Sequence, residues 1–302
     1  MSQPVEEIAL QPSRLPEKTE PSYLQQVLRR FLHHKLAVAG LILLGMLVFA
    51  CLLAPLLAPY NPVQPDYTQI FAPPSARHLM GTDDLGHDVF SQWLWGGRIS
   101  LFIGFASMVV LSVVGTTVGM VSGYYGGWID NLLMRIVDIM LTIPGLLLVI
   151  LMAVVFGQSE AMIIIIIAGT GWLTVSRIVR AEFLSIKASN FVEAAKAAGC
   201  SDFRIMVRHI LPGALPAVLV NATLSMGIAI IVESSLSFLG FGVQPPQYSW
   251  GSMLGLDQAY FMTAWWLAIF PGLGIVLSVL AINFIGDGLR DAMDPRSFRQ
   301  RR

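Results

Sequence analysis

One short polar segment concentrates side chains that could do chemistry: residues 81–88 read GTDDLGHD. Its Asp83, Asp84, His87 and Asp88 are residue types that bind metal ions. Their spacing does not fit an EF-hand loop, however, and Asp and Gly at this density more often form turns and helix caps. We therefore expect a structural segment here and no metal site.

Glu233 is a second candidate, because it lies within a long apolar run at about 214–239. A carboxylate at membrane depth is costly and normally faces a cavity or a partner. Ser234 follows it directly, and Asn221 lies about three turns earlier on the same run. This polar strip could line a translocation pathway, or Glu233 could be a neutral or paired residue that holds helices together. The sequence leaves both interpretations open.

Motifs for catalysis are absent from the sequence. It contains no G-x4-G-K-[ST] phosphate loop, no H-E-x-x-H zinc motif and no nucleophile elbow. We therefore expect no catalytic residues, no ATPase site and no cofactor bound by this chain itself.

The composition is that of a polytopic membrane protein. Hydrophobic residues make up 55% of the chain and charged residues 13%, and the mean hydropathy is +0.68. The two cysteines, Cys51 and Cys200, imply no disulfide framework. A soluble enzyme or binding domain is excluded by this balance.

Six apolar runs reach the length of about 20 residues that a helix needs to cross a bilayer. They lie at about 36–59, 99–123, 136–157, 161–179, 214–239 and 264–287. Residues 36–302 are thus expected to form one all-α, six-span domain. Polar segments at 60–97 and 241–262 separate spans on one side of the membrane, and a polar insert at about 180–213 separates them on the other.

Residues 1–35 precede the first span as a cytoplasmic tail and an amphipathic helix. The first 21 residues are rich in Pro, Glu and Gln, and we expect them to be disordered. From Tyr23 onward, apolar residues recur at helical spacing with polar residues opposite. This pattern favours a helix along the membrane surface, or equally an extension of the first span.

Basic residues decide the orientation. If both termini are cytoplasmic, only Arg77 and Arg98 lie outside, and the other seventeen of the nineteen Lys and Arg residues lie inside. The positive-inside rule therefore places both termini and the insert at 180–213 in the cytoplasm.

The insert itself has a distinctive pattern: EAAKAAG at 193–199, followed by HILP at 209–212. Alanine is the best helix former, so we expect a helix from Ser189 to Ala198 that ends at Gly199 with positive φ. Ser201 should cap a second short helix, which Pro212 should end. The product is a helical hairpin with a smooth face of small side chains.

Further segments read GTDDLGHDVFS at 81–91, SFLGFGVQPP at 237–246 and NFIGDGLRDAMDP at 283–295. Together with the insert they resemble bacterial ABC-importer permeases, specifically the C-type subunit of the dipeptide/oligopeptide subfamily. The resemblance extends from about residue 22 to 297. Gln92 stands where that subfamily usually has Arg.

The resemblance implies the type I ABC-importer permease fold, in a multi-pass protein of the bacterial inner membrane. In that family the EAA insert docks into a groove on a cytoplasmic ATPase. The coupling residues expected from this likeness are Glu193, Ala194, Ala195, Gly199 and Pro212. The tentative pathway residues remain Glu233, Ser234 and Asn221.

The same likeness implies partners. They are a homologous second permease forming a heterodimer, two ATP-binding subunits that hold ATP and Mg²⁺, and an external solute-binding protein. Membrane lipid surrounds the spans, and no nucleic acid is expected. The substrate would be a dipeptide or oligopeptide, or alternatively a nickel chelate, glutathione or another small solute.

Two rivals belong to other classes. An ion-gradient secondary transporter would favour inverted repeats and charged midplane sites, and the sequence shows no internal repeat. A membrane-anchored enzyme lacks a catalytic constellation.

Overall fold

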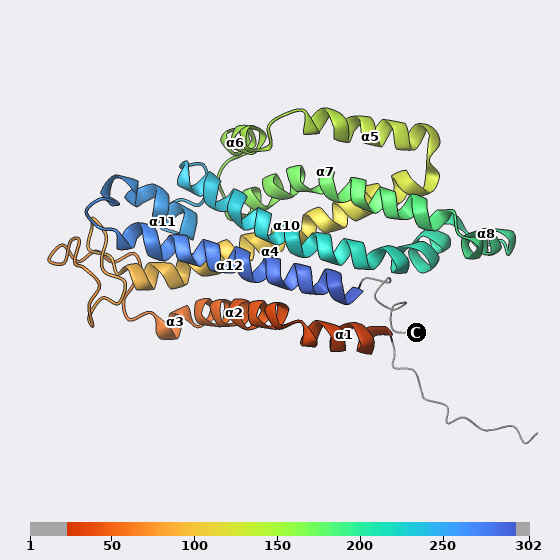
Figure 1. The fold of residues 1–302 in the computed structure, drawn as a ribbon. Coiled ribbons are helices and arrows are strands. Elements are labelled where there is room, and N and C mark those ends of the chain that lie inside the picture. Colours follow the sequence, from red (N-terminus) through yellow and green to blue (C-terminus); the bar gives the residue numbers. More distant parts are fainter. Residues whose placement is uncertain (1–22, 294–302) are drawn as a thin grey trace, which may run out of the picture.

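The computed structural model describes residues 23–293, and every regular element in that range is a helix (Figure 1). Five helices are long and apolar enough to cross a membrane. They are α2 (Lys35–Leu52), α4 (Val89–Tyr125), α7 (Glu160–Lys187), α10 (Leu211–Phe238) and α12 (Trp266–Met293). Each overlaps one of the expected spans, so the all-α, polytopic architecture is as the sequence predicts.

The remaining apolar run differs from the expected continuous span at 136–157. It is divided between α5 (Gly127–Leu141) and α6 (Gly145–Phe156), which are bent by 89° at the break. Pro144 explains the break, because its ring disfavours helical backbone at the preceding residue and removes a donor. The described part of the chain therefore has five continuous candidate spans and a bent pair that can make the sixth.

The second long helix begins earlier than expected. The apolar run suggested a start near residue 99, whereas α4 begins at Val89, so residues 89–97 belong to the helix and not to the preceding loop. Gly97 lies against Trp250, and a Cβ atom at Gly97 would approach the indole to 2.6 Å. Glycine is therefore needed here because Trp250 packs directly against the helix, and it does not mark a turn.

Small residues also bring α4 close to its neighbours within the bundle. A Cβ atom on Gly119 would lie 2.5 Å from the carbonyl oxygen of Ser176 on α7. Membrane helices usually pack in this way, because lipid gives no hydrophobic driving force for their association and small side chains allow close van der Waals contact. The pair α4–α7 forms the centre of the molecule, and α10 crosses both (Figure 1).

At the N-terminal side, α1 (Tyr23–His33) is separated from α2 by a single non-helical residue, His34. The His34 Nδ1 accepts a hydrogen bond of 3.1 Å from the Ala37 N–H and so caps α2. Figure 1 shows α1 continuing in nearly the direction of α2. This geometry favours the extension of the first span over a helix lying across it. The expected disordered tail at 1–21 lies outside the described residues.

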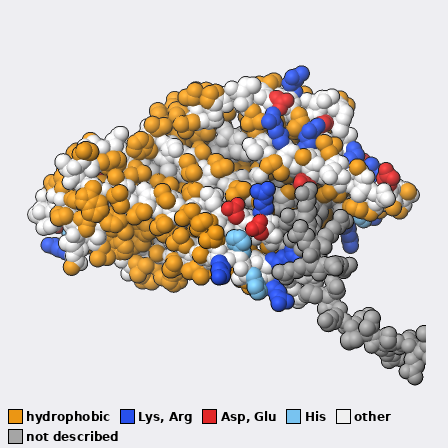
Figure 2. Space-filling model, viewed as in Figure 1, with side chains coloured by type: hydrophobic (Ala, Val, Ile, Leu, Met, Phe, Trp, Pro, Cys, Tyr) orange, Lys and Arg blue, Asp and Glu red, His pale blue; other side chains and the backbone are white. Residues whose placement is uncertain are grey.

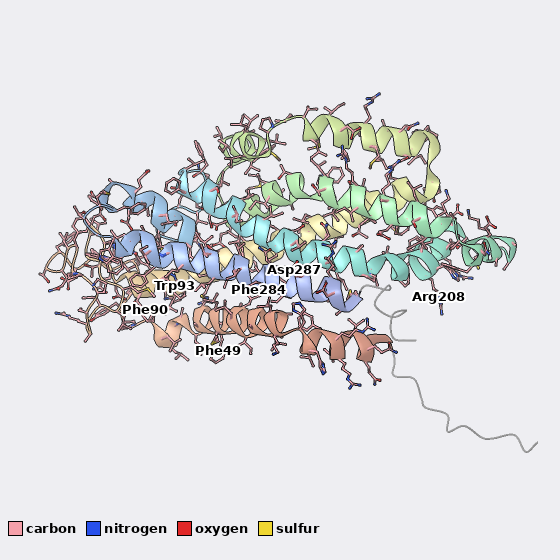
Figure 3. All side chains as sticks on the ribbon, viewed as in Figure 1. Phe49, Phe90, Trp93, Arg208, Phe284 and Asp287 are labelled. Atoms are coloured by element: carbon pink, nitrogen blue, oxygen red, sulfur yellow. The ribbon has the colours of Figure 1, made fainter. Side chains whose placement is uncertain are left out.

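The opposite end of the bundle carries an outer layer, made of the short helix α3 (Ala54–Leu57), residues 58–88, α11 (Trp250–Asp257) and the turn η2 (Gln258–Tyr260). Three indole N–H groups connect this layer with the ends of α4 and α12. The Trp250 indole donates to the Trp93 carbonyl at 3.0 Å, and the Trp93 indole donates to the Phe270 carbonyl at 2.9 Å. The Trp266 indole donates to the Thr82 carbonyl at 3.0 Å. Phe90 and Trp93 mark this end in Figure 3.

The acidic segment at 81–88 forms turns and a cap. Asp88 accepts hydrogen bonds from the Ser91 backbone N–H at 2.8 Å and from His78 Nδ1 at 2.9 Å, which fixes the start of α4. Asp83 accepts from the His87 backbone N–H at 2.8 Å. The structural interpretation of this segment is therefore confirmed.

The two ends of the bundle differ in charge. On the face shown in Figure 2, Lys and Arg side chains gather toward the end that carries α8, and hydrophobic side chains cover most of the rest. By the positive-inside rule this charged end is cytoplasmic. The outer layer then faces the opposite side of the membrane.

Candidate functional site

The polar insert, residues 180–213, forms the tip of the cytoplasmic end (Figure 1). Its first element, α8 (Asn190–Ala197), ends in a Schellman motif. The Gly199 N–H donates to the Lys196 carbonyl at 2.9 Å, and the Cys200 N–H donates to the Ala195 carbonyl at 3.1 Å. Gly199 has a φ of +76°, as the sequence predicts, and it lies at the exposed surface.

One residue of the expected smooth face points inward. Val192 and Ala195 are buried against the rest of the insert, whereas Glu193, Ala194 and Gly199 are exposed. Ala195, expected on the exposed face, instead lies three residues after Val192 on the packed side of the helix, and its part in ATPase coupling stays a prediction. Its role is to seat α8 on its neighbours.

The second half of the insert also differs from the expectation that Pro212 ends a short helix. The chain continues without a break from α9 (Asp202–Arg204) through a π-helical turn, η1 (Ile205–Ile210), into α10. The Leu211 N–H bonds to the Met206 carbonyl, five residues back. Pro212 then lies in the first turn of α10, directly after the π-helical turn, whose wider backbone accommodates a residue without an N–H. Ser201 sits at the N-cap position of α9, but its side chain forms no capping bond.

A tyrosine that the sequence gave no reason to select holds the insert in place. Tyr124, at the cytoplasmic end of α4, is buried, and its hydroxyl donates to Asp202 Oδ1 at 2.5 Å. The ammonium groups of Lys187 and Lys196 each lie 5.6 Å from the centre of its ring. One side chain thus connects α4 with α7, α8 and α9.

Two exposed aromatic side chains extend the surface beside the alanines. Phe191 on α8 is 52% exposed and Phe203 on α9 is 70% exposed. Arg208, labelled in Figure 3, lies on η1 at the same end. Large apolar side chains next to small ones suit a surface that inserts into a groove of another protein. The exposure of Phe191 could have been predicted only by knowing that Val192 and Ala195 face the interior.

Charged pairs brace the helices behind the insert. Arg180 on α7 contacts both carboxylate oxygens of Asp130 on α5, at 2.5 and 2.6 Å. Arg177, about one turn earlier on α7, pairs with Asp138 through one carboxylate oxygen. These pairs fix α5 against α7, so the insert stands on a rigid base.

Glu233 is completely buried within the bundle. Its carboxylate accepts hydrogen bonds from Ser100 on α4 at 3.1 Å and from Ser237 at 2.8 Å. The Trp250 backbone N–H in turn donates to the Ser100 hydroxyl at 3.2 Å. The carboxylate therefore joins α4, α10 and α11, which favours the helix-holding interpretation over a pathway role.

The other tentative pathway residues are not brought together with it. Ser234 donates to the same carboxylate at 3.3 Å, but Asn221 lies about 18 Å away along α10 at the usual helical rise. None of the three lines the two cavities described below. Among residues 23–293, no group of three or more His, Cys, Asp and Glu side chains is arranged to hold a metal ion.

Comparisons with known proteins agree with this arrangement. Residues 115–299 match the family described as "Binding-protein-dependent transport system inner membrane component", and residues 22–74 match the "N-terminal TM domain of oligopeptide transport permease C". The second match begins one residue before α1. Together the two cover most of the described chain.

Relatives of similar length are known. The chain is 42% identical over 276 residues to the dipeptide transport system permease protein DppC of Bacillus subtilis, covering 91% of this chain and 86% of that protein. It is 41% identical over 269 residues to the glutathione transport system permease protein GsiD of Pectobacterium atrosepticum, covering 89% of each.

A solved structure has the same fold. The inward-facing MetNI methionine ABC transporter aligns with a TM-score of 0.53 at 22% sequence identity, covering 68% of this chain and 98% of the matched chain.

Proposed function

Because the chain belongs to the family of binding-protein-dependent transport system inner membrane components, we propose that it is a permease subunit of an ATP-driven importer for dipeptides or oligopeptides. The observation that carries this proposal is the exposed face of α8 at the charged end of the bundle. It offers small side chains, one carboxylate at Glu193 and flanking aromatics to a cytoplasmic protein.

The subunits that act with this chain follow from that surface. Two ATPase subunits would hold ATP and Mg²⁺, and one of them would receive α8 in a groove. A homologous second permease would complete the translocation pathway as a heterodimer, and an external solute-binding protein would deliver substrate to the outer layer.

The insert can transmit movement to two membrane helices, α10 and α4. The continuous run from α9 through η1 into α10 makes the insert one rigid extension of a membrane helix. The hydrogen bond from Tyr124 to Asp202 connects the same insert to α4. Closure of the ATPases would therefore displace α4 and α10 together, switching the bundle between inward-open and outward-open states by rigid-body movement.

The proposal is tested with the assembled complex. The chain is co-expressed with the ATPases, second permease and binding protein of its operon, purified, and reconstituted in liposomes. We expect ATPase subunits to co-purify, and radiolabelled alanyl-alanine to accumulate only with ATP. Failure of any ATPase to co-purify, or absence of peptide uptake by an assembled complex, would overturn it.

Coupling at α8 is tested with two substitutions. Glu193→Arg reverses the exposed charge of α8, and Gly199→Asp introduces a Cβ atom and a charge at a φ of +76°. Both should separate ATP hydrolysis from uptake while the permease pair still assembles. Glu182→Gln, on α7 outside the insert's contact face, is the control. Unchanged uptake by both insert variants would remove α8 from the coupling site.

Glutathione is the second candidate substrate, since one relative at 41% identity carries that name. A competition assay distinguishes glutathione from dipeptides as the substrate. Excess unlabelled glutathione should leave alanyl-alanine uptake unaffected if the importer is a general peptide system. Strong inhibition, together with direct uptake of labelled glutathione, would favour the tripeptide.

A further inference from the structure

Two cavities meet at the outer end of the bundle. The smaller, the outer cavity, has a volume of about 320 Å³ and lies between α4, the start of α7 and the loop before α11. The larger, the inner cavity, has a volume of about 720 Å³ and extends along α2, α4, α10 and α12. Arg98, Ile99 and Glu160 line both cavities, so these residues mark the place where the two join.

The two charged residues at this junction have no ionic partner. Within residues 23–293, no carboxylate lies within 4 Å of Arg98 and no basic group lies within 4 Å of Glu160. The Arg98 guanidinium lies over the Trp95 ring, 4.9 Å from its centre. By contrast, Arg177 and Arg180 at the cytoplasmic end are both paired with aspartates.

The walls around these charges are apolar and aromatic. The outer cavity is lined by Trp95, Tyr248, Pro62 and Pro246. The inner cavity is lined mainly by aliphatic, aromatic and methionine side chains, among them Phe102, Phe105, Met108 and Met226. Binding sites for small molecules are typically of this kind, with a volume of about 300–1,000 Å³, apolar walls and a few placed polar groups.

The charges match one class of molecule. A short peptide at neutral pH carries a carboxylate at one end and an ammonium group at the other. Arginine binds carboxylates with two parallel hydrogen bonds, and a glutamate is the natural partner of an ammonium group. The apolar walls would accept side chains of varied shape, because they offer few directional contacts.

We propose that Arg98 and Glu160 form a transient binding site for zwitterionic short peptides at the outer mouth of the permease. Arg98 binds the terminal carboxylate, Glu160 binds the terminal ammonium group, and the inner cavity receives the peptide's side chains as it moves inward. This inference rests on the proposed function, since it names the chemistry by which the permease recognises its substrate. It adds a site within this chain to whatever selection the binding protein makes.

Another occupant could neutralise the same charges: a side chain of the second permease. The two possibilities differ in what they require. A subunit contact would be needed for assembly, whereas a substrate site would not. Assembly is therefore measured alongside substrate binding.

Uptake by charge-removing variants is the first test. Arg98→Gln and Glu160→Gln are introduced singly into the complete complex in liposomes. Hydrogen bonds to charged groups contribute about 1.5–3 kcal/mol, so each variant should reduce the uptake of alanyl-alanine by about tenfold or more at low peptide concentration. Arg77→Gln, an exposed external arginine that lines neither cavity, is the control for Arg98, and Glu182→Gln, at the other end of α7, is the control for Glu160.

Protection from alkylation is the second test, because it reports binding and not transport. Ile99→Cys places a thiol at the junction, in a background with Cys51 and Cys200 changed to Ser. Alanyl-alanine should slow its modification by a thiol reagent, and alanyl-alanine amide, which lacks the carboxylate, should slow it several-fold less. Adding Arg98→Gln should remove the difference between the two peptides.

The outcomes are distinguishable. If the wild-type complex imports no peptide, the proposed function fails, and the site fails with it. If the wild type imports alanyl-alanine and both charge variants do so at the same rate, the site alone is overturned. Loss of the second permease on purification of either variant would assign the charges to a subunit interface and would also overturn it. Equal protection by both peptides would do the same.

Discussion

The Tyr124 hydroxyl donates a 2.5 Å hydrogen bond to Asp202, and this bond joins the end of a membrane helix to the second half of the polar insert. The two residues are separated by 78 positions in the chain. Asp202 also lies in the first turn of α9, where a carboxylate is favoured by the helix dipole. The bond is thus both a fastening for the insert and a direct mechanical connection to α4.

Removal of this hydroxyl should weaken coupling more than folding. We expect Tyr124→Phe to keep the ring beside the ammonium groups of Lys187 and Lys196 but to lose a charge-assisted hydrogen bond, about 1.5–3 kcal/mol of local stability. Uptake per ATP hydrolysed should fall several-fold. The measurement is the ratio of peptide uptake to ATPase activity in liposomes.

Tyr125→Phe is the matched control, because Tyr125 is the neighbouring residue and is 46% exposed. It should leave the ratio unchanged. Asp202→Asn combined with Tyr124→Phe should cost little more than either change alone, since both remove one interaction. Additive losses would show that the two residues act separately.

Gly199 should tolerate no side chain without strain. A Cβ atom there meets no atom within 4 Å, so the cost of Gly199→Ala comes from its φ of +76°, about 1–2 kcal/mol. We expect the end of α8 to rearrange and ATPase binding to weaken, as measured by co-purification yield. Gly45→Ala, on the exposed side of α2 with equal space and helical backbone, should be neutral or slightly stabilising.

The sequence predicted the positive φ of Gly199, because a helix followed by glycine commonly ends with that glycine in the left-handed conformation. It did not predict which alanines face outward, because Ala194 and Ala195 are chemically alike. The difference arises from packing: Ala195 is in the buried cluster with Val192 and Ile205. A short helix of eight residues has too few turns for its periodicity to show this.

The effects of two prolines on the helices differ from what the sequence predicted. Pro212 does not end a helix, because the π-turn before it and its position in the first turn of α10 remove the usual conflict. The run at 136–157 was expected to be one continuous span, and instead it is divided at Pro144 between two helices that are bent by 89°. Neither outcome follows from local sequence alone, since both depend on what the adjoining helices pack against.

Glu233→Gln should transport peptide at nearly the wild-type rate. The carboxylate is fully buried and accepts its hydrogen bonds from serine hydroxyls on α4 and α10, and the amide oxygen can accept some of them. Glu233→Leu should instead lower the melting temperature in detergent, because it leaves the Ser100 and Ser237 hydroxyls without their acceptor. A large loss of uptake by Glu233→Gln in a stably assembled complex would restore the pathway interpretation.

Stability of the outer layer should fall as pH rises toward neutrality. Burial and the neighbouring Asp83 and Asp84 raise the pKa of Asp257 from 3.8 to about 7. The hydrogen bond to Asp83 raises the pKa of His87 as well. A raised folded-state pKa means stability that is present below the unfolded pKa and is lost as pH rises through the folded one. For Asp257 this window runs from about pH 4 to about pH 7.

Asp257→Asn should remove that loss, because its side chain stays neutral. At pH 8 the variant should melt at a higher temperature than the wild type, by an amount corresponding to a few kcal/mol at most. Near pH 4 the two should melt alike. The measurement is thermal unfolding of the detergent-solubilised complex between pH 4 and pH 8, with Asp66→Asn, in an exposed turn, as the control. A wild type whose melting temperature is flat across this range would contradict the prediction.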